Sequence, residues 1–278
     1  MPSILITGAS GGIGAAVARR YLDEGWTVGL VARRAGKLEE LAAGRAGAVV
    51  LPADVTDAEA VDRVFDAFTA QAGRLDVLFN NAGIFTPPAP IDEISLDDWR
   101  AALAVNLDAM FLCARAAFGR MRRQDPQGGR IINNGSISAY VPRPGSVTYT
   151  ATKHGITGLT RTISLDGRPF GIACGQIDIG NAETPMVADL KARAVAAGQV
   201  PPQTMDVANA ALVPAIVADE PNRGWSLLID LRRRTTIALT SDTAGRCRRS
   251  RQPPPLAAGE RVDRQAPAHE RFVAVLSG

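Results

Sequence analysis

The chain has 278 residues with 46% hydrophobic and 21% charged side chains, which suits one soluble α/β domain with a buried core. It contains no uninterrupted apolar run long enough to span a membrane and no basic leader before its first apolar run, so we expect a cytoplasmic protein. The three cysteines are widely spaced and match neither a metal site nor a disulfide framework.

Short apolar runs alternate with longer amphipathic segments in the first 231 residues. Helices are predicted over Ile13–Glu24 and Ala58–Ala72, and Leu96–Arg123 is long enough for one continuous helix. Because strands that are separated by helices usually pair in parallel, the pattern predicts a parallel sheet with helices on both faces. The runs predicted as strands are Ile4–Thr7, Thr27–Ala32, Ala48–Pro52, Val77–Asn80, Arg130–Asn134, Ile172–Ile177 and Trp225–Leu231.

The last part of the chain differs from the rest in charge and composition. Residues 1–231 carry a net charge of −3, whereas residues 232–278 carry +6 and are rich in Arg and Pro. This extension shows no sustained apolar period, so we expect residues 235–270 to be poorly ordered and residues beyond 235 to take no part in the sheet. We therefore predict a domain over 1–231 and an extension over 232–278 that is mobile, an off-frame product, or docked through a short helix at Phe272–Leu276.

A glycine-rich turn follows the first predicted strand directly, in the sequence Thr7-Gly8-Ala9-Ser10-Gly11-Gly12-Ile13-Gly14. Glycine lets the backbone turn sharply from strand to helix, and it lets a pyrophosphate approach the free N–H groups at the helix N-terminus. The position of the turn between a strand and a helix therefore predicts a nucleotide site rather than a bend without a ligand.

The end of the second predicted strand indicates which nucleotide is bound. Ala32 stands where an acidic residue would bind the ribose 2′-OH of NAD, and Arg33 follows it. A guanidinium at this point can pair with the 2′-phosphate of NADP, so NADP(H) is predicted and NAD(H) is less favoured. The alternative is that Arg33 and Arg34 are solvated charges at the start of a helix.

The motif Thr-Gly-x-x-x-Gly-x-Gly, with glycines at 8, 12 and 14, resembles the nucleotide-binding signature of the short-chain dehydrogenase/reductase family. Further motifs in the family's order extend the resemblance over residues 3–231. It implies the single-domain branch of the family, with a Rossmann-type doubly wound parallel sheet of about seven strands and helices on both faces. At Gly11, NADP-preferring relatives often have a second basic residue. The implied cofactor-binding residues are Gly8, Ser10, Gly12, Ile13, Gly14, Arg33, Asp54, Val55, Asn80, Ala82, Gly83, Tyr149, Lys153, Gly180 and Thr184.

Some of these motifs also have plain structural interpretations. Asp54-Val55 resembles the family's adenine-contacting pair, but an Asp also opens turns and caps helices. The run Asn80-Asn81-Ala82-Gly83 matches a family motif beside the cofactor, although Asn and Gly also suit an ordinary turn. Thr184 would contact the nicotinamide carboxamide, and Ile179 replaces the proline that usually precedes the glycine at 180.

A second group of residues points to catalysis. Tyr149 and Lys153 have the Tyr-x-x-x-Lys spacing, which puts both side chains on one face of a helix. The ammonium can lower the pKa of the phenol from its ordinary value of about 10, which makes the phenol a usable proton donor or acceptor. Ser136 lies 13 residues before Tyr149, the spacing of the family's catalytic serine, whereas Ser138 at 11 residues fits less well. The resemblance adds Asn106, which would hold a water that links Lys153 to solvent, although a locally bonded helix asparagine is the alternative.

Together these motifs predict an NADP(H)-dependent oxidoreductase that transfers a hydride between the nicotinamide and a carbonyl or secondary alcohol carbon, with Tyr149 as general acid/base. The alternative is an NADP-binding sensor without turnover, but such relatives typically lack the tyrosine or the lysine. The expected partners are a small-molecule substrate and further copies of the chain in a homo-dimer or homo-tetramer, with no nucleic acid, membrane or metal. The segment between Thr184 and Thr204 is expected to cover the substrate pocket without identifying the substrate.

Overall fold

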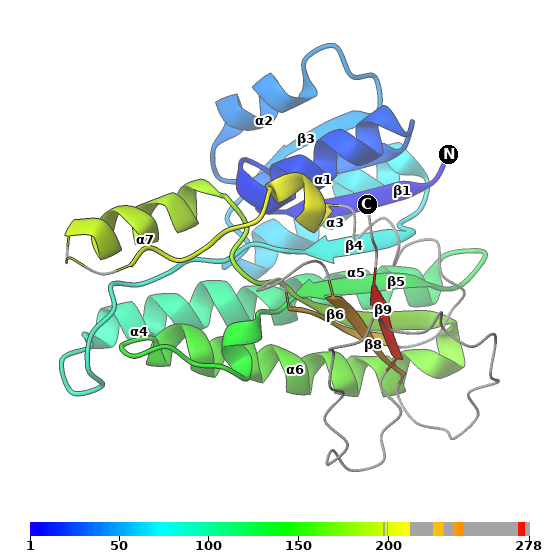
Figure 1. The fold of residues 1–278 in the computed structure, drawn as a ribbon. Coiled ribbons are helices and arrows are strands. Elements are labelled where there is room, and N and C mark those ends of the chain that lie inside the picture. Colours follow the sequence, from blue (N-terminus) through cyan, green and yellow to red (C-terminus); the bar gives the residue numbers. More distant parts are fainter. Residues whose placement is uncertain (197, 199, 212–224, 231–235, 242–271, 276–278) are drawn as a thin grey trace.

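Parallel strands interleaved with helices form most of a nine-stranded sheet in the computed structural model (Figure 1). The structure describes residues 1–196, 198, 200–211, 225–230, 236–241 and 272–275. The strand order is β3-β2-β1-β4-β5-β6-β7-β8-β9, so the chain begins inside the sheet and builds it outward in both directions. The parallel strands are β1 (Ser3–Thr7), β2 (Thr27–Ala32), β3 (Ala48–Pro52), β4 (Val77–Asn80), β5 (Gly129–Asn134), β6 (Ile172–Asp178) and β7 (Trp225–Asp230).

This arrangement confirms the predicted doubly wound sheet. Each strand begins and ends within one residue of its predicted bounds, and only Leu231 of the predicted runs lies outside the described residues. At the centre of the sheet, Ile4 of β1 is in register with Val28 of β2 on one side and with Val77 of β4 on the other. The strand order reverses between β1 and β4, and a doubly wound sheet opens a crevice for a ligand at such a point.

Helices cover both faces of the sheet (Figure 1), as the alternating pattern predicted. In β1, Ile4 and Ile6 pack on the side of α1 (Gly12–Asp23) and α2 (Ala35–Ala42), whereas Leu5 packs on the opposite side. This alternation follows from the two-residue period of a strand, and apolar residues at every position satisfy both faces. The opposite side is covered by α3 (Ala58–Ala72), α5 (Ala109–Arg123) and α6 (Val147–Gly167).

Helix α3 shows how local sequence produces one of these layers. The side chain of Asp57 accepts hydrogen bonds from the N–H groups of Glu59 (2.9 Å) and Ala60 (3.2 Å), which caps the start of the helix. Gly73 ends it with a left-handed φ of 80°. Between the caps, Val61, Val64, Phe65 and Phe68 recur at helical spacing and are all buried. The last of these, Phe68, packs over Gly29 of β2, where an added Cβ would come within 2.8 Å of its ring.

We expect Phe68→Ala to lower the free energy of unfolding by about 3–5 kcal/mol, because it removes a fully buried aromatic side chain and leaves a cavity over a glycine that cannot fill it. Urea denaturation measures the change. The control Ile91→Ala alters a side chain that is 75% exposed and should cost less than about 0.5 kcal/mol. Equal costs for the two substitutions would contradict the packing described here.

The predicted single helix over Leu96–Arg123 is continuous but not uniform. It consists of α4 (Leu96–Leu103), a π-helical turn η1 (Ala104–Asp108) and α5. Length and a mean hydropathy of 1.5 would also suit a membrane span, yet 44% of its apolar window is buried inside the fold. The apolar side of α5 packs against the sheet and α3, which accounts for its composition.

Two segments of the C-terminal extension correct the expectation that residues beyond 235 stay outside the sheet. Strand β8 (Thr236–Ser241) pairs antiparallel with β7, and β9 (Phe272–Val275) pairs antiparallel with β8. The physical reason is that β7 would otherwise end the sheet with a row of unpaired backbone groups, which an adjacent segment can satisfy by turning back. The segment 272–275 is thus a strand rather than the docked helix that was one alternative. The Arg-rich and Pro-rich residues 242–271 lie outside the described part of the chain.

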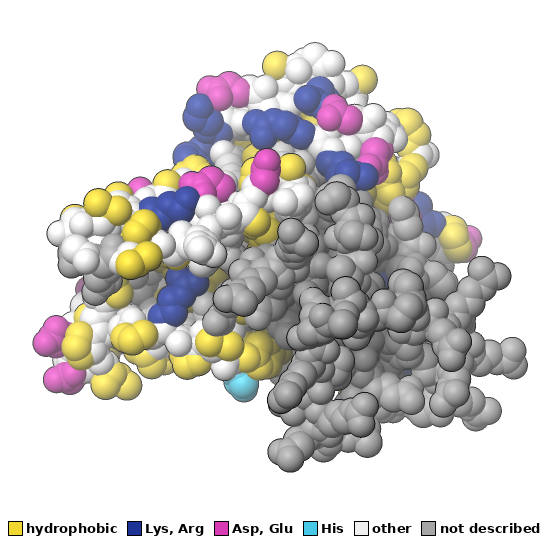
Figure 2. Space-filling model, viewed as in Figure 1, with side chains coloured by type: hydrophobic (Ala, Val, Ile, Leu, Met, Phe, Trp, Pro, Cys, Tyr) yellow, Lys and Arg dark blue, Asp and Glu magenta, His cyan; other side chains and the backbone are white. Residues whose placement is uncertain are grey.

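The surface shown in Figure 2 carries Lys, Arg, Asp and Glu side chains intermixed over the described elements.

Cys113 of α5 and Cys174 of β6 are buried and free, and Cys247 lies outside the described residues. Burial raises the pKa of the Cys113 thiol to about 12, so this side chain is a packing group rather than a nucleophile.

Candidate active site

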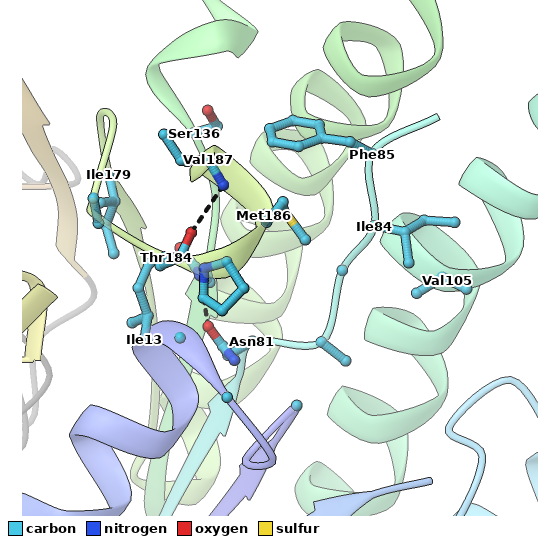
Figure 3. Close-up of a pocket in the computed structure, with 18 of the residues that line it drawn as sticks. Ile13, Asn81, Ile84, Phe85, Val105, Ser136, Ile179, Thr184, Met186 and Val187 are labelled. Atoms are coloured by element: carbon cyan, nitrogen blue, oxygen red, sulfur yellow. Dashed lines mark hydrogen bonds between the residues drawn. The ribbon is translucent and has the colours of Figure 1, made fainter. Parts of the chain in front are cut away.

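A cavity of about 410 Å³ lies at the carboxyl ends of the parallel strands, beside the point where the strand order reverses. The loops that follow each of the strands β1 to β6 line it, together with the start of α7 (Pro185–Ala196) (Figure 3). Of the predicted site residues, Gly14, Asn80 and Asn106 lie behind its walls. The others line it, namely Gly8, Ser10, Gly12, Ile13, Arg33, Asp54, Val55, Ala82, Gly83, Ser136, Tyr149, Lys153, Gly180 and Thr184.

The glycine-rich turn between β1 and α1 needs its glycines for two different reasons. Gly8 and Gly12 have φ angles of 69° and 53°, in the left-handed region that other residues rarely adopt. At Gly14 the reason is space, because a Cβ would lie 2.4 Å from the carbonyl oxygen of Gly8. No side chain caps the start of α1, and its first residues line the cavity, so their N–H groups are left for a ligand. This cradle fits the pyrophosphate of a dinucleotide.

Hydrogen bonds hold the turn against the end of β4. Thr7 Oγ1 accepts from the N–H groups of Asn81 (2.8 Å) and Ala82 (3.0 Å), and Asn81 Nδ2 donates to the carbonyl of Thr7 (2.9 Å). Asn81 therefore shapes the cradle, although only its neighbours were predicted as site residues. Asn80 is 1% exposed and donates to the carbonyl of Met110 (2.8 Å), so it joins buried elements and does not face the cavity, contrary to its prediction as a cofactor contact.

The two arginines after β2 lie at one end of the cavity and have different partners. Arg33 is largely exposed and lies 4.0 Å from the carboxylate of Asp54. Arg34 folds back over the glycine-rich turn, and its Nη2 donates to Ser10 Oγ (2.9 Å). Its Nη2 also lies 3.5 Å from the place a Cβ of Gly11 would take, so the missing side chain at Gly11 leaves room for this guanidinium. Arg34 was not predicted as a site residue, because only the folded loop brings it to the turn.

Asp54 opens a turn, which was one of the two interpretations given to it. Its Oδ1 accepts from the N–H (3.0 Å) and hydroxyl (2.7 Å) of Thr56, and these hydrogen bonds lower the pKa of the carboxyl below its ordinary value. It is therefore the opening residue of a turn that also lines the cavity beside Val55.

Ser136, Tyr149 and Lys153 meet at the other end of the cavity, as predicted. Tyr149 and Lys153 lie on one face of α6, with Lys153 Nζ 5.5 Å from the centre of the phenol ring. Ser136 follows β5, and its Oγ accepts from the N–H of Ser138 (3.1 Å), so the competing serine supports the predicted one. Lys153 Nζ donates to the carbonyl of Asn134 (2.7 Å).

Burial decides the ionisation of these groups. It raises the pKa of Tyr149 to about 12, and a hydrogen bond with Ser136 and the charge of Arg143 oppose this only in part. It lowers the pKa of Lys153 to about 8, against the charge of Asp178. The expected lowering of the phenol's pKa is therefore wrong for this structure, because desolvation outweighs the groups that lower it. A phenol with a raised pKa stays protonated at neutral pH and is suited to donate a proton.

Asn106 lies in the π-helical turn η1 and is fully buried. Its Oδ1 accepts from the N–H of Ile84 (2.8 Å), and its Nδ2 donates to the carbonyl of Ile84 (3.0 Å) and to Thr152 Oγ1 (3.4 Å). It thus joins the loop after β4 to the middle of α6, one residue before Lys153. All three bonds reach other elements of the fold, so the alternative of an asparagine bonded within its own helix is wrong.

Apolar side chains surround the space in front of the tyrosine. The ring of Phe85 lies 4.2 Å from that of Tyr149, centre to centre, and Ile84, Met186 and Val187 complete the wall (Figure 3). A second hollow of about 260 Å³ continues past Phe85 and Met186 along α7. This arrangement supports the expectation that the segment after Thr184 covers the substrate space.

Two charged residues of this region were not predicted. Arg143 lines the cavity and donates to Asn181 Oδ1 (2.6 Å), which joins the loops after β5 and β6. Asp178 ends β6 and is 2% exposed, and its Oδ1 accepts from the N–H of Ser136 (2.8 Å). No spacing motif marks either residue, because both act on groups that are distant in sequence.

The fold and the cavity define a dinucleotide-binding α/β enzyme in which a tyrosine, a serine and a lysine line the same cavity as the glycine-rich turn. The sequence matches the family model of short chain dehydrogenases over residues 2–194, and the chain belongs to the short-chain dehydrogenase/reductase family. It is therefore an oxidoreductase that acts on hydroxyl or carbonyl groups of small molecules with a nicotinamide cofactor.

Individual relatives agree with this assignment. A 3beta-hydroxysteroid dehydrogenase of Mediterraneibacter gnavus is 35% identical over 68% of this chain and 71% of its own length. A cis-4-hydroxycyclohexanecarboxylate dehydrogenase of Sinomonas cyclohexanicum is 37% identical over 71% of this chain and 80% of its own length. The crystal structure of levodione reductase superposes with a TM-score of 0.72 at 27% identity, over 78% of this chain and 90% of that chain. A nucleotide sensor without turnover is not supported by these comparisons.

We expect Gly14→Ala to weaken binding of the nicotinamide dinucleotide by at least about tenfold, because the new Cβ must push Gly8 or Asn81 out of the cradle. Quenching of tryptophan fluorescence on titration with cofactor measures the affinity. Gly158→Ala is the control, since it adds the same methyl group to an exposed position of α6 where nothing lies within 4 Å. Unchanged affinity in a folded Gly14→Ala variant would show that the close approach is not needed.

Proposed function

We propose that this protein is an NADP(H)-dependent dehydrogenase/reductase in which Tyr149 is the general acid/base for a carbonyl or secondary alcohol. The observation that carries the proposal is that Ser136, Tyr149 and Lys153 line the same cavity as the glycine-rich cradle. A nicotinamide cofactor, when bound, supplies or accepts the hydride, and the chain's own residues handle the oxygen and the proton.

The roles of these residues follow from their surroundings. The hydroxyl of Ser136 holds the substrate oxygen, and the protonated phenol of Tyr149 donates its proton to that oxygen during reduction. Lys153 places a positive charge behind the phenol and loses it as the pH rises through about 8. Asn106 keeps the loop after β4 against α6 and so keeps this group of side chains together. Phe85 and Met186 exclude water from the oxygen that is reduced.

We expect Tyr149→Phe to reduce turnover by about 100-fold or more, because the phenol acts mainly in the transition state. Cofactor affinity should stay within a few-fold of the wild-type value, since the phenyl ring keeps its contact with Phe85. A panel of ketones with different ring sizes and polar groups, followed by NADPH absorbance, measures the rates. Turnover in the variant that equals the wild-type rate would remove Tyr149 from this role.

The preference for NADP(H) rests on two guanidinium groups at the end of the cavity opposite the tyrosine. Arg33 is exposed there without a closer partner than Asp54 at 4.0 Å, so it can turn to a phosphate. Arg34 already lies over Ser10 and beside Gly11, where NADP-preferring relatives often carry their second basic residue. Two guanidinium groups can share a 2′-phosphate through charge-assisted hydrogen bonds. The uncharged 2′-hydroxyl of NAD(H) cannot form such bonds, so NADP(H) should bind more tightly.

We expect Arg33→Ala and Arg34→Ala each to weaken NADPH about 10- to 100-fold while NADH affinity changes far less. Fluorescence titration of each variant with both cofactors measures this difference. Arg161→Ala, which removes an exposed guanidinium from α6, serves as the control. A wild-type preference for NADH, or an equal loss of both cofactors, would contradict the assignment.

The remaining expectations concern the setting of the enzyme. The two buried free cysteines suit a reducing compartment such as the cytoplasm. Exposed apolar side chains on α5 and α6, Phe111 and Leu165, support a homo-dimer or homo-tetramer in which these helices are covered. The division into a domain over 1–231 and an extension over 232–278 belongs to the same proposal, with β8 and β9 attached to the domain's sheet.

A further inference from the structure

A carboxylate is buried next to the reacting side chains at the end of β6. Asp178 is 2% exposed, and its Oδ1 accepts hydrogen bonds from the N–H of Ser136 (2.8 Å) and from Nε2 of Gln176 (2.6 Å). An ionised carboxylate in such a place is costly unless hydrogen bonds and an opposite charge compensate it. Its position therefore calls for a reason beyond packing, since an apolar residue would fill the same space at lower cost.

The main chain beside Asp178 is shaped to receive it. A Cβ at Gly135 would lie 2.1 Å from Asp178 Oδ1 and 2.6 Å from Gln176 Nε2. Gly135 has no left-handed φ angle, so glycine is needed here for space and not for conformation. The N–H of Gly135 donates to the carbonyl of Ile177 (2.8 Å), which keeps the loop after β5 against the end of β6.

Gln176 is itself fixed by a chain of buried side chains. Its Nε2 donates to Thr157 Oγ1 (3.1 Å), and its Oε1 accepts from Thr160 Oγ1 (3.3 Å). Thr160 Oγ1 in turn accepts from Asn133 Nδ2 (2.9 Å). The amide that donates to Asp178 therefore cannot turn away without breaking contacts with α6 and β5, so the carboxylate is held in one orientation.

Asp178 also faces the charged groups of the active site. Lys153 and Tyr149 of α6 are the ionisable side chains on the described elements around it, and Arg143 acts on Tyr149 from the loop after β5. Lys153 donates to the carbonyl of Asn134, two residues before the serine whose N–H the carboxylate accepts. Burial raises the pKa of Asp178 to about 6, and Lys153 opposes that rise.

We propose that Asp178 is a positioning residue of the active site: its carboxylate holds the main chain of Ser136 in place and keeps Lys153 in the charged form. This rests on the proposed function of Ser136, Tyr149 and Lys153. The carboxylate takes no part in proton transfer to substrate, because it does not line the cavity. It acts through two residues that line the cavity: through Ser136 by a hydrogen bond to its backbone N–H, and through Lys153 by charge.

The substitution Asp178→Asn tests the charge while preserving shape, since the amide oxygen can still accept from Ser136 and Gln176. Wild-type kcat for the ketone that the panel shows to be reduced fastest should fall as the pH rises above about 8, because Lys153 loses its proton there. In the variant this alkaline fall should move down by about one pH unit or more, because the negative charge that favours the protonated lysine is gone. At pH 8 the variant's kcat should be about fivefold or more lower than that of wild type.

A second measurement does not depend on turnover. The folded-state pKa of Asp178 is raised from 3.8 to about 6, so wild type loses stability from this group as the pH rises through about 6. The melting temperature of Asp178→Asn, relative to wild type, should therefore increase between pH of about 4 and pH of about 7. Asp166→Asn removes an exposed carboxylate from the same helix as Lys153 and should show neither effect.

The outcomes separate the two proposals. A variant whose kcat falls at the same alkaline pH as that of wild type, at any absolute rate, would overturn the role of Asp178 and leave the function intact. The same holds if the melting-temperature difference does not change with pH. If wild type itself reduces none of the ketones, the proposed function fails and the melting data alone report on the buried carboxylate.

Discussion

Buried polar side chains at the carboxyl ends of the strands must find their partners inside the protein, and this requirement shapes the site. Asn80 of β4 donates to Asn133 of β5, Asn133 donates to Thr160 of α6, and Thr160 donates to Gln176 of β6. Each unsatisfied member of such a chain would cost a full desolvation penalty, so the members fix one another. The line crosses the middle of the sheet just below the loops that carry the reacting groups. Its last acceptor, Asp178, also accepts from the N–H of Ser136, so this line links the placement of the serine to side chains of β4, β5, α6 and β6.

Local patterns were enough to predict the seven parallel strands of the sheet and most of the cavity. The strands are apolar on both faces, and the glycine-rich turn and the Tyr-x-x-x-Lys pair are set by spacings of a few residues, which a sequence shows directly. Arg34, Arg143 and Asp178 could not be found in this way. Each of them takes its role from a partner between 24 and 42 residues away, and no period or motif connects the two. The raised pKa of Tyr149 has the same origin, because burial is a property of the folded chain.

The C-terminal extension shows the limit of composition as a guide to structure. Its charge and its arginine and proline content differ from the rest of the chain, and these features favour a segment outside the core. The run Thr236–Ser241 is nevertheless of ordinary strand length and lies close in sequence to β7, whose outer edge offers unpaired backbone groups. The pairing of β7 with β8 uses main-chain N–H and C=O groups. The average composition of the whole extension therefore does not reveal a strand of only six residues.

The π-helical turn at Ala104–Asp108 places an additional residue within what would otherwise be one regular helix. Since each residue advances an α-helix by about 100°, α4 and α5 are rotated out of phase with each other across the turn. One consequence is that the whole stretch cannot be described by a single apolar stripe, even though each half has its own. Another is that removing one residue from the turn would rotate α5 by about 100° relative to α4, so the packing of α5 on the sheet and the hydrogen bonds of Asn106 to Ile84 and Thr152 would not both survive.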